Sequence, residues 1–371
     1  MDATSVAEAF PAGEFLAEEL EARGWTQQDF AAVLGRPVQF VSEVITGKRE
    51  ITRESAAQIG AALGTSAQLW LNLQETYLLW VQSQDEQVQA SIDAVRLRAR
   101  LRELAPVREL QKRGFVSEGP PEEQARDIVG LLGMGSLDDV PEISFAPRRS
   151  NSDETVTLVQ RAWVACVRQV AGQLWAAPYD REAFEGVVRG LSSAVRQPSS
   201  MANFQASFAE AGVRLVYLEA FPGGKLDGCA LLLGGAPVIG ISGRGKRLDK
   251  VLFTILHESA HVLLGHVEQA GGVIADDLAT PSEELWEREA DELAGSLALA
   301  GDIATVPGRI TRTWVDAEAR RLDVHPLVLI GCLQKEGRIP WSTTLVRDAI
   351  SAVPHLEAWD APRPLRGSAS A

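Results

Sequence analysis

The stretch LDKVLFTILHESAHVLLGH, residues 248–266, decides the fold of the C-terminal half of this 371-residue chain. Its leucines, isoleucines and valines recur at the spacing of a buried helix. His257 and His261 are four residues apart, so their rings lie on one face of that helix, one turn apart. Two imidazoles at this spacing can bind one zinc ion, and the sequence therefore predicts a metal site on a buried helix.

Glu258 follows the first of these histidines and projects about 100° round the helix from it. It is therefore placed to take a proton from a metal-bound water instead of binding the metal. Zinc lowers the pKa of such a water from about 15.7 toward about 7, so a carboxylate can generate hydroxide near neutral pH. Two histidines that occurred on a buried apolar helix by chance would lower the stability of the fold, unless a metal or other polar partners satisfied them. The HExxH pattern thus predicts zinc-dependent hydrolysis with Glu258 as the general base.

A third ligand is expected from a second helix, because catalytic zinc sites usually have three protein ligands and an open position for water. The segment TPSEELWEREADELAGSLAL, residues 280–299, predicts such a helix. Glu287 and Asp291 share one of its faces, so we expect Glu287 to bind the metal and Asp291 to orient a ligand histidine. The helix is expected to begin with three start signals that include a capping box: Thr280, Pro281 and Glu283.

Other side chains near this site are weaker candidates. Glu289 is the alternative ligand on the second helix. His266 ends the first helix and is expected to support a ligand instead of binding metal. His325 and His355 have no neighbours at metal-ligand spacing, so we expect them to be structural.

Residues 211–299 resemble the ImmA/IrrE family of metallopeptidases. The resemblance is carried by GVRLVYLE, APVIGIS, VLFTILHESAHVLLGH and EREADELA. It implies an α+β, gluzincin-like fold, a zinc ion, and site-specific cleavage of a transcriptional repressor or related regulatory protein. The family's glutamate and its Asn or Asp four residues later fall on Glu287 and Asp291. The usual HELGH is HESAH here, which keeps the ligands and the base, whereas LALAGD replaces the family's LLMP-like ending and alters the packing there.

Residues 12–80 predict a separate, all-helical domain. Thr26 is a good N-cap for a helix over residues 27–34, and Pro37 suits the start of a helix that ends at Ile45. The segment resembles HigA-type antitoxins of the XRE helix-turn-helix class in GEFLAEELEARGWTQQDFAAVLG, VQFVSEVITGKREIT and ALGTSAQLWLNLQETYLLW. The helix from Pro37 to Ile45 is the expected recognition helix.

This resemblance predicts operator DNA as a partner, a homodimer on paired half-sites, and a toxin as a further partner. Side chains expected to contact DNA lie on or beside the two helices of the motif. Those expected near base edges are Gln27, Gln39, Ser42 and Glu43, and those suited to phosphates are Lys48 and Arg49. Residues 1–80 hold five basic and eleven acidic side chains, so a module retained for dimerisation or partner binding is the alternative.

Residues 90–113, ASIDAVRLRARLRELAPVRELQKR, have the opposite charge balance, with seven basic and three acidic side chains. A solvated helical connector is one interpretation, and a contact with the DNA backbone or a partner is the other. The basic residues are Arg96, Arg98, Arg100, Arg102, Arg108, Lys112 and Arg113, and the acidic ones are Asp93, Glu103 and Glu109. Residues 116–155, rich in Gly, Pro, Ser and acidic residues, are expected to be a linker with one short helix.

The bulk composition is that of a globular protein, with 46% hydrophobic and 23% charged residues. A net charge of −14 argues against a general nucleic-acid coat. The start MDATSVAEAF lacks the pattern of a signal peptide, and no apolar run reaches the roughly 18–20 residues of a membrane span. The three dispersed cysteines, Cys166, Cys229 and Cys332, suit a reducing compartment. We therefore expect a cytoplasmic protein without membrane contact.

The sequence as a whole predicts a multidomain protein. An all-α helix-turn-helix domain is expected at residues 1–80, a basic connector and linker at 81–155, and an α+β gluzincin-like metallopeptidase domain with a helical C-terminal extension at 156–371. The expected function is transcriptional regulation coupled to zinc-dependent cleavage of a regulatory protein. The alternative is a non-proteolytic repressor or antitoxin whose zinc fold senses a ligand or docks a toxin. Glu258 favours the enzyme, because a structural zinc site requires no general base.

Overall fold

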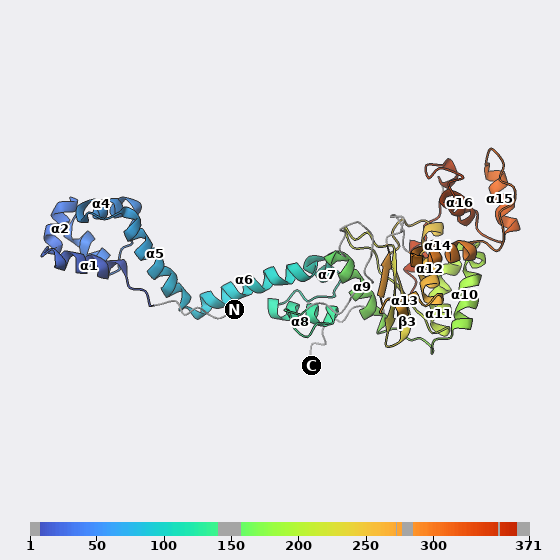
Figure 1. Ribbon diagram of the computed structural model, residues 1–371, viewed down its shortest axis with the longest axis horizontal. Helices are drawn as coiled ribbons and strands as arrows, with labels where there is room; N and C mark the ends of the chain where they lie inside the picture. Colours follow the sequence, from blue (N-terminus) through green and yellow to red (C-terminus); the bar gives the residue numbers. More distant parts are fainter. Residues whose placement is uncertain (1–7, 140–156, 272, 277–284, 348, 362–371) are drawn as a thin grey trace. The chain divides into compact units, whose positions relative to one another are not determined.

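A computed structural model of the chain describes residues 8–139, 157–271, 273–276, 285–347 and 349–361 (Figure 1). The chain forms two compact units, one up to Arg96 and one from Leu97 onward. This division lies beyond residue 80, the expected end of the first domain. The reason is that residues 97–139 pack into the second unit instead of forming a free connector.

The N-terminal unit is a group of helices closed around Leu16, Phe30, Ile59 and Trp70, all of which are buried. Thr26 accepts a hydrogen bond from the Asp29 amide and caps the second helix as expected. Pro37 is the N-cap of the third helix and not its first residue, because its ψ of 145° is extended. The helices are α1 (Ala12–Ala22), α2 (Gln27–Leu34), α3 (Val38–Ile45), α4 (Arg53–Leu63) and α5 (Ala67–Ser83).

The second unit begins with helices that the sequence assigned to a connector and a linker. Helix α8 is amphipathic and packs on α9 through Ile128, Leu131 and Leu132, which are buried. Its apolar residues recur at helical spacing, so this part of the expected linker is an ordered element of the core. The bounds are α6 (Glu86–Leu104), α7 (Val107–Lys112), α8 (Pro121–Leu132) and α9 (Leu158–Ala171).

A small mixed sheet lies at the centre of this unit, with the strand order β1-β3-β2-β4. Strands β2 and β3 form an antiparallel hairpin whose turn residues, Gly234 and Gly235, have φ values of 60° and 79°. Two consecutive positive φ values are typical of a tight type I′ turn, which joins two neighbouring antiparallel strands. β1 pairs parallel to β3, and β4 pairs antiparallel to β2. The bounds are β1 (Arg214–Tyr217), β2 (Gly228–Leu233), β3 (Ala236–Ile241) and β4 (Val273–Asp276).

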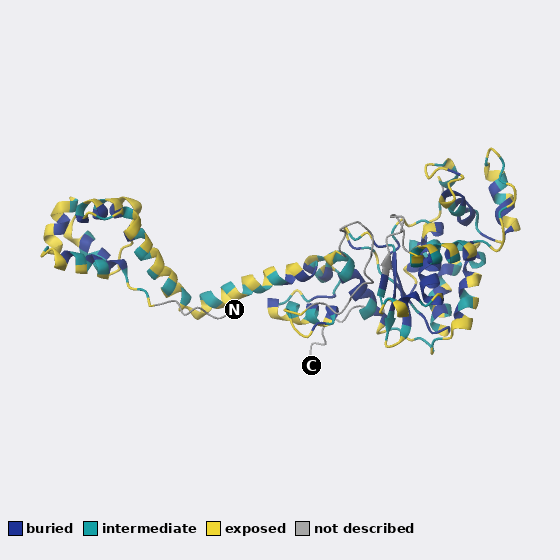
Figure 2. Ribbon diagram, viewed as in Figure 1, coloured by how far each residue is buried: buried dark blue, intermediate teal, exposed yellow. Residues whose placement is uncertain are grey.

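Helices cover both faces of the sheet, so this unit has three layers (Figure 2). Alternate strand residues point to opposite faces. Leu215 and Ile239 join the core with α10 (Arg181–Ala194), α11 (Phe204–Glu210) and α12 (Leu248–Leu263). Val216 and Val238 join the core with α9.

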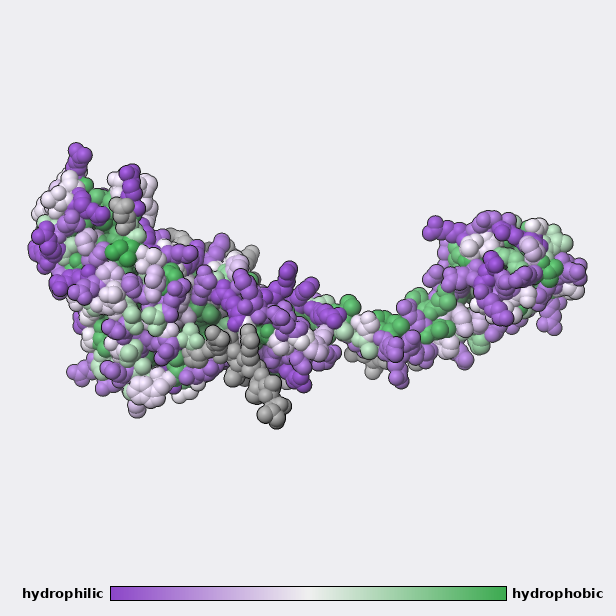
Figure 3. All heavy atoms as spheres, turned by 180° about the vertical axis from the view of Figure 1, so that it is seen from behind, coloured by the Kyte–Doolittle hydropathy of each residue, from purple (hydrophilic) through white to green (hydrophobic). Residues whose placement is uncertain are grey.

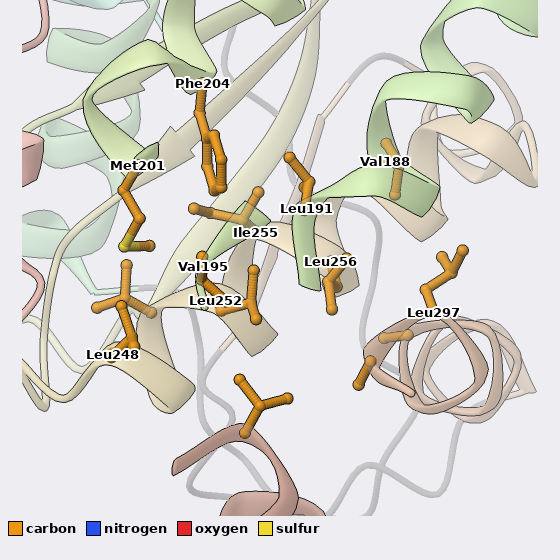
Figure 4. Packing of buried hydrophobic residues seen from close by; sticks show 14 of the residues in the cluster. Val188, Leu191, Val195, Met201, Phe204, Leu248, Leu252, Ile255, Leu256 and Leu297 are labelled. Atoms are coloured by element: carbon orange, nitrogen blue, oxygen red, sulfur yellow. The ribbon is translucent and has the colours of Figure 1, made fainter. Parts of the chain in front are cut away.

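Helix α12 lies inside the first of these cores. Figure 4 shows Leu252, Ile255 and Leu256 of this helix among Leu191 of α10 and Phe204 of α11. Burial on nearly every side fixes the rotation of α12 about its axis. The face that carries the two histidines is therefore directed toward α14 (Leu285–Ala298), on which α12 packs closely.

The helical C-terminal extension that the sequence predicts consists of short helices after α14. Proline residues interrupt it, because proline cannot donate a backbone hydrogen bond within a helix. The short elements after α14 are α15 (Arg312–Arg321), α16 (Pro326–Lys335), η2 (Thr344–Val346) and α17 (Val353–Leu356), and those that precede it are η1 (Pro198–Asn203) and α13 (His266–Gln269). The start signals expected at Thr280, Pro281 and Glu283 lie outside the described residues. Among the residues that the structure describes, no helix is long and apolar enough to cross a membrane.

Candidate metal centre

The two histidines of α12 present their Nε2 atoms to each other at 3.1 Å. Both side chains are buried, and the ring centroids are 4.8 Å apart. Two nitrogens bound to one tetrahedral zinc at about 2.0–2.1 Å would be about 3.3 Å apart. The separation between His257 and His261 therefore fits a shared metal ion.

Glu287 of α14 brings a carboxylate to the same point. Its Oε2 lies 3.4 Å from Nε2 of His257, and its Oε1 lies 3.8 Å from Nε2 of His261. One ligand atom from each of the three residues lies within 4.8 Å of the other two. Close packing of α14 on α12 places Glu287 here, and the fully buried Ala290 and Ala294 allow that packing. The donor set of two imidazoles and one carboxylate suits zinc.

Glu258 is fully buried beside this cluster, and its carboxylate lies against Gly228 at the start of β2. A Cβ atom at Gly228 would overlap the carboxylate oxygen Oε1. Glycine therefore leaves the space that the side chain of the expected general base occupies. Gly228 is not among the residues predicted for the site, although an isolated glycine in an apolar strand often indicates such a close approach.

Asp291 lies against the first histidine, in a position that suits the orienting role expected for it. Its Oδ1 lies 3.0 Å from Nδ1 of His257 and 2.9 Å from Nζ of Lys335. Burial raises the pKa of Asp291, but hydrogen bonds from His257 and Lys335 outweigh it and the pKa lies below its usual value. The ionised carboxylate accepts the Nδ1 proton and leaves the Nε2 lone pair of His257 for a metal.

Lys335 is a part of the site that sequence reasoning missed. It lies on α16, and its Nζ is 3.8 Å from the centre of the Phe253 ring as well as bonded to Asp291. No motif or spacing relates Lys335 to the HExxH helix. Only the packing of the C-terminal helices onto α12 brings it to the metal centre.

His266 connects the second histidine to a carboxylate through contacts of its two ring nitrogens. Its Nδ1 is 3.1 Å from Nδ1 of His261, and its Nε2 is 3.1 Å from Oε2 of Glu289. Trp286 stacks on the His266 ring at 5.5 Å between centroids. Burial, followed by the nearby His261, lowers the pKa of His266. Glu289, the alternative ligand, thus contacts His266 and does not belong to the group of three candidate ligands.

A cavity of about 650 Å³ lies next to the metal centre. Residues from α12, α14 and α16 line it, and Trp341 completes the wall. Phe253 comes from α12, Asp291 from α14, and Val328 and Lys335 from α16. Its wall combines apolar side chains with a few charged groups, which is the usual character of a ligand-binding pocket. The volume is within the range of pockets that hold small ligands or substrate side chains.

The residues expected to contact DNA lie on α2, on α3 and shortly after α3. Gln39 and Arg49 both donate hydrogen bonds to the Glu43 carboxylate, at 2.8 and 2.6 Å. The bond from Arg49, then the bond from Gln39, lowers the pKa of Glu43. Arg49 is thus ion-paired in the absence of DNA, whereas the sequence analysis assigned it to phosphates. Gln27 and Lys48 are exposed, and Ser42 is half-buried.

Comparison with known proteins covers the N-terminal unit. Residues 16–70 match the helix-turn-helix family model. The HTH-type transcriptional regulator YddM of Escherichia coli K12 is 29% identical over 86 residues, which are 23% of this chain and 85% of that protein.

Two solved structures are similar in sequence to part of this chain. An addiction module antidote protein of the HigA family from Coxiella burnetii is 32% identical, over 20% of this chain and 83% of that one, with a TM-score of 0.20. A protein described as a putative antidote of a plasmid maintenance system, from Nostoc punctiforme, is 36% identical over 23% and 97%, with a TM-score of 0.22.

The helix-turn-helix assignment therefore rests on the family match and on sequence identity, and the metal centre lies outside the matched residues 16–70. These findings confirm the expected motif, with α2 and α3 as its two helices. The chain belongs, through its N-terminal unit, to the helix-turn-helix transcriptional regulators of the XRE type and is homologous there to HigA-type antidote proteins.

Proposed function

We propose that the C-terminal unit of this regulator is a zinc endopeptidase of the ImmA/IrrE type, which cleaves a repressor or a related regulatory protein. The observation that carries the proposal is the convergence of His257, His261 and Glu287 within 4.8 Å, with Glu258 buried beside them. The three ligands would hold the metal and leave a position for water. A structural zinc site would have no use for the additional carboxylate.

Each polar side chain of the site has a distinct part in hydrolysis. The zinc ion, when bound, supplies a Lewis acid that polarises the scissile carbonyl and acidifies a water. Glu258 accepts the proton from the attacking water at a carboxylate oxygen and can return it to the leaving amine. Asp291 and His266 hold His257 and His261 in the tautomers that direct Nε2 toward the metal.

The cavity beside the metal centre supports a polypeptide as the substrate. It borders Asp291, the residue that orients His257, so a chain positioned for hydrolysis could extend a side chain into it. Phe253, Val328 and Trp341 offer apolar surface, while Lys335 and Asp291 offer charged groups. Such a wall accepts a bulky side chain with one polar end.

The N-terminal unit would direct this activity to an operator as a homodimer, with a toxin as a further partner. Helix-turn-helix proteins commonly bind paired half-sites as dimers. The second half of α5 provides an apolar surface for such pairing, because Leu78, Leu79 and Val81 are exposed by 38%, 62% and 43% (Figure 3). Adjacent exposed apolar side chains on one helix are typical of a protein contact.

Metal content is the first test of this function. We expect about one zinc per chain in purified protein, and its loss in His261→Ala and in Glu287→Ala. Glu292→Ala is the matched control, because Glu292 is an exposed carboxylate of the same helix and does not belong to the group of three candidate ligands. Wild-type protein that was never exposed to chelator and holds no metal would refute the zinc site.

Cleavage is tested separately with Glu258→Gln, which should keep the metal. Zinc-loaded wild type and this variant are incubated with a peptide library from a bacterial lysate, and new N-termini are identified by mass spectrometry. We expect cleavage by the wild type alone, with a loss of at least a hundredfold in the variant. Equal zinc binding without cleavage by either protein would favour the non-proteolytic alternative, in which the zinc fold senses a ligand or docks a toxin.

A further inference from the structure

The basic segment 90–113 contains three arginines that are neutralised within the segment itself. Arg96 pairs with Asp93 at 2.8 Å, Arg100 with Glu103 at 3.1 Å, and Arg113 with Glu109 at 2.6 Å. These pairs use all three acidic residues of the segment. No acidic residue of the segment itself is thus left to pair with the remaining four basic side chains.

These four residues, Arg98, Arg102, Arg108 and Lys112, form what we term the basic patch. All four are exposed, and within the described parts of the chain no ion pair joins any of them to an acidic side chain. Arg98 and Arg102 are four residues apart on α6, and Arg108 and Lys112 are four apart on α7. Each pair therefore shares one face of its helix. Figure 3 shows hydrophilic side chains gathered over this stretch of the chain.

The basic patch stands on a rigid base. Leu101 and Leu104 of α6, with Val107 and Leu110 of α7, are buried in the core of the second unit. Arg113, directly after α7, donates hydrogen bonds to the carbonyl oxygens of Glu219 and Ala220, and its guanidinium lies 4.4 Å from the centre of the Phe221 ring. Four cations are thus held at fixed positions on packed helices and not on a loose linker.

We propose that the basic patch binds phosphates of duplex DNA beside the site that the helix-turn-helix domain occupies. Arg98 lies only two positions after Arg96, the last residue of the N-terminal unit. Once the N-terminal unit binds DNA, this short tether keeps the local concentration of phosphate near the patch high. Residues 1–80 carry a net charge of −6 (5 − 11) and attract DNA poorly by themselves, so a separate cationic surface supplies the missing electrostatic attraction.

The salt dependence of DNA binding tests this proposal on the full-length chain. The probe is a 40-base-pair duplex of random sequence, and binding is followed by fluorescence anisotropy between 50 and 200 mM KCl. A quadruple variant replaces Arg98, Arg102, Arg108 and Lys112 by glutamine. Each lost phosphate contact flattens the plot of log K against log[salt] by about 0.9, so we expect a slope smaller by about 3.6. Over this range, the wild type should lose about a hundredfold more affinity than the variant.

A matched variant separates the patch from net charge. Replacement of Arg96, Arg100, Arg181 and Arg189 by glutamine also removes four positive charges, but from arginines that are already paired with acidic residues. We expect this control to keep a slope within about one unit of the wild-type value. Circular dichroism melting curves should show that both variants are folded.

Three results would overturn the proposal. The first is the same slope in the patch variant and in the matched control. The second is wild-type protein that does not bind the duplex at 50 mM KCl. The third is patch-dependent binding to a single-stranded RNA of equal length or to polyglutamate that is tighter than binding to the duplex, since either would assign the patch to another class of partner. None of these results bears on the metal content or the cleavage assay.

Discussion

Lys335 connects a remote helix to the proposed metal centre through a single side chain. Its ammonium group lies 2.9 Å from Asp291, and Asp291 in turn lies 3.0 Å from Nδ1 of His257. The lysine favours the ionised carboxylate, and the carboxylate fixes the tautomer of the histidine. Groups that support metal ligands in this way commonly change metal affinity by 10- to 100-fold, on the order of 1–3 kcal/mol.

Loss of the Lys335 ammonium should therefore weaken metal binding without removing a ligand. We expect Lys335→Met to lower zinc affinity by roughly tenfold in competition with a chromogenic chelator, and Lys335→Arg to restore most of it. Lys250→Met is the control, because Lys250 lines the same cavity while its ammonium group lies near the Trp341 ring. Equal zinc affinity in Lys335→Met and wild type would show that the lysine has no positioning role.

His325 makes the stability of the second unit depend on pH. Its Nδ1 accepts a hydrogen bond from the Leu327 amide at 3.1 Å and caps α16. Burial, followed by the charge of Arg312, lowers its pKa below 6.5. The unfolded chain therefore binds the proton more tightly than the folded chain. Stability from His325 is present above pH 6.5 and is lost as pH falls toward the lowered pKa.

Removal of this titration should flatten the pH dependence of unfolding. Both proteins are first freed of metal with a chelator. We then expect the urea midpoint of His325→Asn to change less between pH 7.5 and 5.5 than the urea midpoint of the wild type. Asparagine can still cap the helix, so the free energies of unfolding of the two proteins should differ by less than about 1 kcal/mol at pH 7.5. The same pH dependence in both proteins would mean that the His325 cap is not proton-linked.

At the scale of elements, α12 and α5 contrast in how they meet their surroundings. Helix α12 is buried along nearly its whole length, which fixes its histidine-bearing face toward α14. Helix α5 buries Trp70 near its start, but its second half exposes apolar side chains. An apolar surface of this kind is expected to pair with a second copy of the chain.

A charge on that surface should disrupt the proposed dimer. We expect Leu79→Glu to convert a dimer into a monomer, measured by sedimentation equilibrium at micromolar concentration. Burial of a carboxylate at an apolar interface costs several kcal/mol, which corresponds to a loss of affinity of at least a hundredfold. Gln68→Glu, also exposed on α5, adds the same charge ten residues before Leu78, about 15 Å away along the helix axis, and should leave the dimer intact. A wild-type monomer, or a dimeric Leu79→Glu variant, would contradict this assignment.

At the scale of the whole molecule, the chain has two compact units with separate cores. A protein of this kind is not expected to unfold in a single two-state transition. Only the second unit contains the candidate metal ligands, so a bound metal stabilises that unit and leaves the first unchanged.

Chelation should therefore act on one unfolding transition alone. We expect two calorimetric transitions in zinc-loaded protein, and EDTA should lower the midpoint of one of them by several degrees. A ligand present at 100 times its Kd contributes about 2.7 kcal/mol, which is ample for such a shift. In His261→Ala the midpoint of the same transition should already have the lower value seen with EDTA, and EDTA should not lower it further. One cooperative transition, or an EDTA shift in both, would show that the units are not independent.

Local patterns were enough to predict several elements of this chain. The capping box at Thr26 and the glycine pair at Gly234 and Gly235 specify their own backbone geometry, so α2 and the β2–β3 hairpin were predictable. The i, i+4 spacing of His257 and His261 places them on one helical face whatever the rest of the fold does. The apolar residues of α8 also recur at helical spacing in the sequence. They lie among Gly, Pro and acidic residues, which favoured the interpretation of this segment as a linker.

The sequence by itself determined the helix-turn-helix unit, the hairpin and the HExxH helix, because each depends on interactions between residues near in the chain. It also indicated Glu287 through the helix that carries it. Only the tertiary structure decided that Glu287 meets both histidines, that Gly228 makes room for Glu258, that Lys335 contacts Asp291, and which arginines of residues 90–113 pair with acidic side chains. The first three of these relations join residues far apart in the chain. They depend on how helices and strands pack against one another, and no local spacing encodes them.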